Sequence, residues 1–114
     1  MIDIEQKLKD LNEKYECVHI RHSSNSNVHF DVWGQTDHGS LNEYTKFFTY
    51  LSDQNTLIID NAMCCFIQNE FNQIVLNNID YSRAMVLSSS DWEEGTVLRL
   101  SHQDGGVTVL DFFN

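Results

Sequence analysis

The C-terminal stretch from residue 96 to residue 113 constrains the fold more than any other part of the chain. Two runs of alternating apolar and polar residues flank a Gln-Asp-Gly-Gly segment, a pattern typical of an antiparallel β-hairpin. A three-residue loop over 104–106, with a glycine at positive φ, keeps the apolar residues on one face, whereas a two-residue loop would place Asp111 among them. We therefore predict the three-residue loop, which gives two apolar pairs and one ion pair: Leu98 with Phe112, Leu100 with Leu110, and Arg99 with Asp111.

A second hairpin is predicted near the N-terminus. Residues 17–22 and 28–33 alternate with period two and are separated by a short polar segment. Pairing His22 with Val28 places the apolar side chains of both strands on one face. That register gives two apolar pairs, Ile20 with Phe30 and Val18 with Val32, and three pairs on a polar opposite face: His19 with Asp31, Arg21 with His29, and Cys17 with Trp33.

Two helices are predicted from apolar spacing and capping signals. The first covers residues 3–15, where Asp3 and Gln6 form a variant capping box and four apolar residues recur at helical spacing: Ile4, Leu8, Leu11 and Tyr15. The second covers about residues 41–52 and follows a capping box made by Ser40 and Glu43.

Residues 57–79 have no single interpretation. We predict a short buried strand over 57–59 and a hairpin of 64–68 with 73–77, closed by residues 69–72, because β-branched and aromatic residues are frequent there. A helix over about 63–74 fits the apolar spacing as well. With a further strand at residues 84–89, the expected fold is α+β: an antiparallel sheet of about five to seven strands with two helices packed on one face and a C-terminal β-hairpin.

The composition is that of one folded domain covering residues 1–114. Apolar residues make up 41% of the chain and aromatic residues 11%, which excludes a disordered chain. The N-terminus has neither a basic region nor an apolar run, so we expect no signal peptide and no membrane span. The three cysteines lack the spacing of a disulfide framework or a zinc site, so we expect reduced thiols in a cytoplasmic protein.

The negative charge is unevenly distributed along the chain, whose formal net charge is −10. Residues 22–114 hold three basic and twelve acidic side chains, a net charge of −9. Such a surface repels nucleic acid and anionic lipid and attracts a basic partner at low salt, so we expect a basic protein partner, no direct nucleic-acid binding and no membrane binding. Acidity that serves solubility alone is the competing explanation.

A large aromatic residue, Trp92, lies in a predicted loop among three carboxylates. A loop tryptophan commonly packs back onto its own core, but one surrounded by carboxylates also has the composition of a contact anchor for a cationic surface. We predict a partner-binding surface made of this loop, the polar strand face and the loop after it: Asp91, Trp92, Glu93, Glu94, Asp31, Trp33 and Asp37.

The polar strand face also has an enzymatic interpretation. A carboxylate beside imidazoles, here His19, His29 and Asp31, is used in acid-base catalysis, and it is also an ordinary cross-strand pair on a solvated face. The sequence has no identifiable nucleophile, no phosphate-binding glycine loop and no three-ligand metal set, because His22 points to the opposite face. We therefore predict no catalytic residues, no metal and no cofactor, and we rank a small hydrolase below a binding protein.

A small, acidic, proline-free domain without motifs resembles bacterial immunity proteins in physical type, a likeness that covers no particular residues. It implies an inhibitor that neutralises a basic toxin, such as a nuclease, by occluding its active site. A phage-type inhibitor of nucleic-acid machinery that mimics phosphate charge belongs to the same class with a different target.

Overall fold

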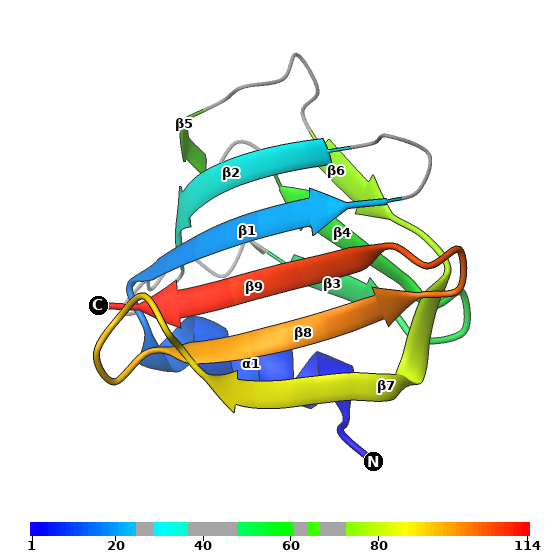
Figure 1. Ribbon diagram of the computed structural model, residues 1–114, viewed down its shortest axis with the longest axis horizontal. Helices are drawn as coiled ribbons and strands as arrows, with labels where there is room; N and C mark the ends of the chain where they lie inside the picture. Colours follow the sequence, from blue (N-terminus) through cyan, green and yellow to red (C-terminus); the bar gives the residue numbers. More distant parts are fainter. Residues whose placement is uncertain (25–28, 37–47, 61–63, 67–72) are drawn as a thin grey trace.

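The computed structural model of the protein describes residues 1–24, 29–36, 48–60, 64–66 and 73–114. These residues contain one helix and nine strands. The strands form a six-stranded antiparallel sheet, in the order β5-β2-β1-β9-β8-β7, and a three-stranded sheet, in the order β3-β4-β6. Figure 1 shows α1 and the smaller sheet on the same side of the larger sheet. The elements are α1 (Ile4–Lys14), β1 (Cys17–Ser23), β2 (His29–Gln35), β3 (Phe48–Leu51), β4 (Thr56–Asp60), β5 (Cys64–Phe66), β6 (Gln73–Leu76), β7 (Ile79–Ser88), β8 (Thr96–His102) and β9 (Val107–Phe113).

One hydrophobic core lies between these layers. Side chains from α1, from the inner face of the larger sheet and from the smaller sheet belong to a single buried cluster, which includes Leu8, Ile20, Leu57, Ile59 and Leu110. The α+β class is confirmed, but the prediction of two helices packed on one sheet is wrong, because the described residues form one helix and a second, three-stranded sheet.

The helix α1 forms where the sequence predicts it. The Asp3 carboxylate caps the first turn by accepting a hydrogen bond from the backbone N–H of Gln6 at 3.1 Å. The side chain of Gln6 donates to Asp10 at 2.8 Å instead of returning to Asp3. The predicted apolar stripe is buried in full: Ile4, Leu8, Leu11 and Tyr15. No helix in the described part of the chain is long and apolar enough to cross a membrane.

The strands β8 and β9 form the predicted C-terminal hairpin in a register that differs by two residues. The observed pairs are Leu98 with Leu110, Leu100 with Thr108, Arg99 with Val109 and Val97 with Asp111. The predicted ion pair of Arg99 and Asp111 is therefore wrong. Because a shift of two residues leaves every side chain on its face, the four apolar residues predicted for the core are all fully buried: Leu98, Leu100, Leu110 and Phe112.

The loop between β8 and β9 explains this difference. Counted between His102 and Gly106, which are joined by a hydrogen bond, it has three residues and a glycine at positive φ, as predicted, but it spans 103–105, and the glycine is Gly105 at φ 89°. The backbone N–H of His102 donates to the oxygen of Gly106 at 2.8 Å, which closes the loop one residue early. Two adjacent glycines permit both loops, since each can adopt positive φ. Glycine is favoured at Gly106 for another reason, because a Cβ there would lie 3.1 Å from the backbone oxygen of Ser23, a tight contact.

The strands β1 and β2 also pair two residues away from the predicted register. The observed pairs include Ile20 with Val32, His19 with Trp33 and Arg21 with Asp31. The five predicted pairs are therefore wrong: Ile20 with Phe30, Val18 with Val32, His19 with Asp31, Arg21 with His29, and Cys17 with Trp33. The backbone N–H of Thr36 donates to the oxygen of Glu16 at 2.9 Å, and the Thr36 hydroxyl donates to the oxygen of Tyr15. These bonds hold the register at the end of the hairpin far from its polar loop, whose sequence carries no turn signal.

The predicted second helix is wrong where the structure describes it. Phe48–Leu51 forms β3, which pairs with β4, while residues 41–47 and the Ser40–Glu43 capping box lie outside the described residues. The sequence Phe-Thr-Tyr-Leu has high strand propensity, and pairing with a buried strand prevailed over helical spacing.

Between residues 57 and 79 the predicted strands exist but pair differently. The strand over 57–59 is confirmed as part of β4. The predicted hairpin is wrong, because β5 pairs with β2 in the larger sheet and β6 pairs with β4 in the smaller one. The competing helix over 63–74 is wrong as well, and residues 69–72 lie outside the described part. Because β6 pairs with β4 and not with β5, Ile74 and Leu76 of β6 are buried in the core beside β4.

Candidate functional site

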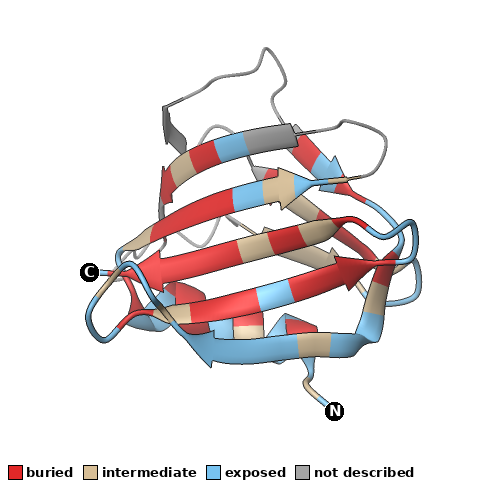
Figure 2. Ribbon diagram, in the orientation of Figure 1, coloured by how far each residue is buried: buried red, intermediate tan, exposed pale blue. Residues whose placement is uncertain are grey.

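The face of the six-stranded sheet that points away from α1 and the smaller sheet is the outer face. Cross-strand partners on this face form two rows that run across the sheet from β7 to β2. The first row is Leu87, Val97, Asp111, His19 and Trp33. The second row is Met85, Arg99, Val109, Arg21 and Asp31. Figure 2 shows that residues of β8 and β9 are mostly buried while β7 is mostly exposed. The outer face is therefore partly covered at its centre and open along β7.

His19 lies at the centre of the first row. Its Nε2 lies 2.5 Å from Oδ1 of Asp31, a diagonal contact, since Asp31 is directly opposite Arg21. The Trp33 ring is stacked on the imidazole with 3.7 Å between centroids and 6° between planes. The His19 side chain is 10% exposed and that of Asp31 is 53% exposed. The side chains of His19 and Asp31 are therefore in contact although the two residues are not directly opposite each other, and one face of the imidazole is covered by an indole.

The connection between β7 and β8, residues 89–95, is the acidic loop. The Ser89 hydroxyl accepts hydrogen bonds from the backbone N–H groups of Asp91 and Trp92 at 3.2 and 3.1 Å. The backbone N–H of Gly95 donates to the oxygen of Trp92 at 3.0 Å, and the Tyr15 hydroxyl donates to the oxygen of Glu94 at 2.8 Å. These bonds order the loop internally and attach it to the end of α1.

The acidic loop packs onto the outer face through contacts among three aromatic rings. Trp92 is stacked on Phe113 of β9, with 4.0 Å between centroids and 5° between planes. Trp33 lies edge-on to both rings, at 6.3 Å from Trp92 and 6.0 Å from Phe113. Trp92 is partly buried, so it packs onto its own domain and holds the loop in place.

The carboxylates of the acidic loop remain exposed on this support. Asp91, Glu93 and Glu94 are exposed, and Glu94 has a positive φ of 61°. The guanidinium of Arg21 lies 3.9 Å from Asp91, a solvent-exposed pair that contributes little stability. Two parts of the predicted partner-binding surface, the loop and the strand residues Asp31 and Trp33, therefore meet at one end of the outer face. The structure brings them together through the pairing of β1 with β9, which no local pattern reveals.

Sequence reasoning missed the burial of Asp111. It is 1% exposed, and its Oδ1 has no hydrogen-bond partner among the described residues. The indole Nε1 of Trp92 is likewise buried without a partner in the described part. An aspartate in an alternating strand is expected to face solvent, whereas here Asp111 lies in a central strand between Val97 of β8 and His19 of β1.

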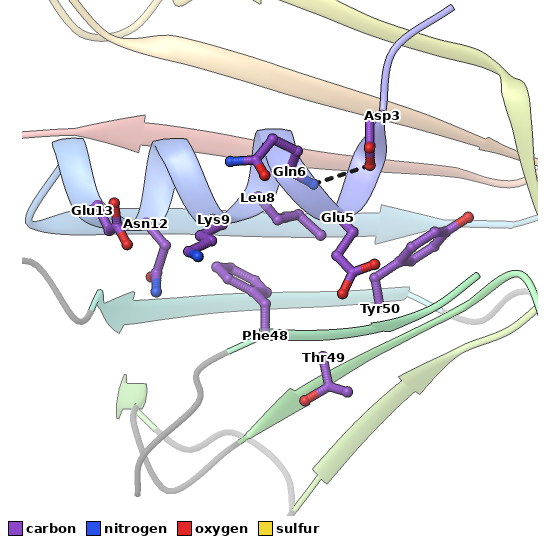
Figure 3. A pocket seen from close by; sticks show the side chains of 10 residues that line it. All are labelled: Asp3, Glu5, Gln6, Leu8, Lys9, Asn12, Glu13, Phe48, Thr49 and Tyr50. Atoms are coloured by element: carbon purple, nitrogen blue, oxygen red, sulfur yellow. Dashed lines mark hydrogen bonds between the residues drawn. The ribbon is translucent and has the colours of Figure 1, made fainter. Parts of the chain in front are cut away.

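The remaining predicted residues do not add to this surface. Asp37 lies outside the described residues, and so does the side chain of His29. A groove of about 440 Å³ lies elsewhere, between α1 and β3, and Figure 3 shows charged helix residues facing the rings of Phe48 and Tyr50 there. Among the described residues, no group of three or more His, Cys, Asp or Glu side chains is arranged to hold a metal ion.

The candidate site thus combines an ordered backbone, exposed carboxylates and adjacent aromatic rings. Comparison with known protein families, with curated protein sequences and with solved structures finds no match to this chain.

Proposed function

We propose that the protein is a small acidic binding protein, an immunity protein or inhibitor that occludes the active site of a basic protein such as a nuclease toxin. The acidic loop is the observation that supports this best. It holds the carboxylates of Asp91, Glu93 and Glu94 in solvent on a backbone already ordered by hydrogen bonds and by the Trp92 ring. A preordered loop loses little conformational entropy on binding, which favours affinity.

Charge is the second support. The chain carries a net charge of −10, so a basic partner is attracted over long range and associates quickly. A protein partner fits better than mimicry of nucleic acid. Duplex DNA presents a charge about every 1.7 Å along its axis, whereas the outer face interrupts its acids with Arg21 and the exposed Arg99.

In this proposal Trp92 orients the loop, while Asp31 and the partly buried Trp33 extend the contact along β2. Cytoplasmic action is part of the proposal, since an immunity protein protects the cell that contains the toxin. A hydrolase that uses His19 and Asp31 gains no support from the geometry, because Trp33 covers the imidazole and the groove between α1 and β3 lies on the other side of the sheet.

The test begins with affinity capture from the source cell, with the full chain as bait, followed by binding kinetics with the captured basic protein. Glu93→Gln combined with Glu94→Gln should slow association about three- to tenfold at low salt and leave dissociation nearly unchanged. The matched control removes two exposed charges far from the loop, Glu5→Gln with Asp53→Asn. Equal effects of the two double variants, or the lack of a basic partner, would contradict the proposal.

A further inference from the structure

The strand β7 is an edge strand with exposed apolar side chains. It ends the six-stranded sheet, and its far edge pairs with no other described strand. Four large apolar residues along it are well exposed: Tyr81 at 48%, Met85 at 45%, Val86 at 37% and Leu87 at 42%. An irregularity between Asp80 and Met85 bends the strand, as Figure 1 shows, so that a regular edge remains over residues 85–88. Such an edge is a template for another strand unless it is protected.

The hydrogen-bonding direction of each residue in this edge follows from the register. The backbone N–H of Ser89 donates to the oxygen of Gly95, so residue 89 faces β8. Because facing alternates along an antiparallel ladder, residues 85 and 87 also bond to β8, whereas residues 86 and 88 direct their N–H and C=O groups to the free edge.

We propose that the free edge of β7 binds the same edge of a second copy of this chain. A twofold axis perpendicular to the sheet requires side chains of equal facing to pair, and placing that axis at Val86 pairs residues 85–87 with themselves. Met85 then meets Leu87 of the second copy on the outer face, twice, and the two Val86 residues meet on the inner face. The two six-stranded sheets become one continuous sheet, and the exposed side chains of Met85, Val86 and Leu87 gain apolar neighbours in both copies.

Charge supports a second copy as the occupant. Apart from Arg83, the segment from Tyr81 to Ser88 carries no charge, so the edge itself is not repulsive. Antiparallel pairing directs the exposed Arg83 of each copy toward the end of β7 in the other copy, where the acidic loop begins. The charge pattern of the edge is therefore self-complementary. The regular segment is short, so the contact is smaller than the roughly 1,200 Å² of a stable interface, and we expect a dissociation constant on the order of 10 µM.

This dimer is independent of the proposed inhibitor function, and its test needs no partner. Sedimentation equilibrium of the full chain from about 1 µM to 1 mM should show a monomer–dimer transition. Val86→Pro removes an N–H that points away from β8, so it should abolish the dimer without breaking the ladder. Val86→Thr has nearly the same shape and retains that N–H, so it should still dimerise. Arg83→Glu should weaken the dimer at least tenfold, while the same charge change at Arg99 should alter it less than twofold.

Amide hydrogen exchange keeps the test decisive if Val86→Pro does not fold. The amides of residues 86 and 88 should become protected as concentration rises, whereas those of 85 and 87 are protected throughout, and Ser88→Pro serves as a second edge variant. A monomer at 1 mM would overturn the proposal. So would a dimer that survives both the proline and the Arg83→Glu variants, or protection of amides 86 and 88 in the dilute monomer, since a segment of the same chain would then cover the edge.

Discussion

Replacing Trp92 with alanine tests whether this residue supports the acidic loop from within the domain. The Trp92 ring is partly buried and stacks on Phe113 at 4.0 Å. Covering roughly 100 Å² of its surface contributes about 2.5 kcal/mol, and the stacked geometry adds about 0.5–1.5 kcal/mol. The buried Nε1 without a partner in the described residues opposes this by about 1 kcal/mol. We therefore expect Trp92→Ala to lower the free energy of unfolding by about 2–3 kcal/mol.

Urea denaturation followed by circular dichroism measures this change, and the melting temperature should fall by roughly 10 °C. The matched variant Trp92→Phe keeps an aromatic ring against Phe113 and removes the unpaired Nε1, so it should lie within about 1 kcal/mol of the wild type. A loss below about 0.5 kcal/mol for Trp92→Ala is typical of an exposed side chain and would refute the internal role assigned to the ring.

Three further predictions concern stability. Leu100→Ala should cost about 2–5 kcal/mol, because Leu100 is fully buried, whereas alanine at the exposed Val75 should cost less than about 0.5 kcal/mol in the same denaturation assay. Gly95→Ala should cost about 1–3 kcal/mol and loosen the acidic loop, since a Cβ there would lie 2.9 Å from the backbone oxygen of Phe112; unchanged thermal stability would contradict this. Burial, and to a lesser degree Tyr81, raises the pKa of Tyr50, so the unfolded chain ionises first and stability should fall as the pH rises above about 10. Tyr50→Phe should reduce that loss of stability at alkaline pH, and an unchanged dependence of the unfolding free energy on pH above about 10 would count against the assignment. At neutral pH the same variant should be neutral or stabilising by about 1 kcal/mol, because it removes a buried hydroxyl without a partner in the described residues.

Much of the local structure could be predicted from the sequence. The Asp3 cap, the apolar stripe of α1 and the faces of the strands depend on residues within one or two turns or on simple alternation. Alternation specifies which face a side chain occupies and nothing more, which explains why both hairpins keep their predicted faces while their registers differ from prediction by two residues.

The candidate site was predictable in its residues but not in its arrangement. Asp31 and Trp33 belong to β2, and the acidic loop follows β7, so their proximity depends on the strand order of the larger sheet. The same order places Phe113 beneath Trp92 and buries Asp111, which no local signal indicates.

The sequence by itself determined the alternating faces, the cap of α1, the uneven negative charge and the presence of an acidic turn around a tryptophan, because each follows from neighbouring residues. Only the tertiary structure decided the register, the division of the strands between two sheets and the packing of Trp92 onto Phe113. Gly105 and Gly106 can each adopt a positive φ, so the local sequence permits both loops. The choice between them therefore depends on contacts with strands distant in the chain, such as the pairing of β9 with β1.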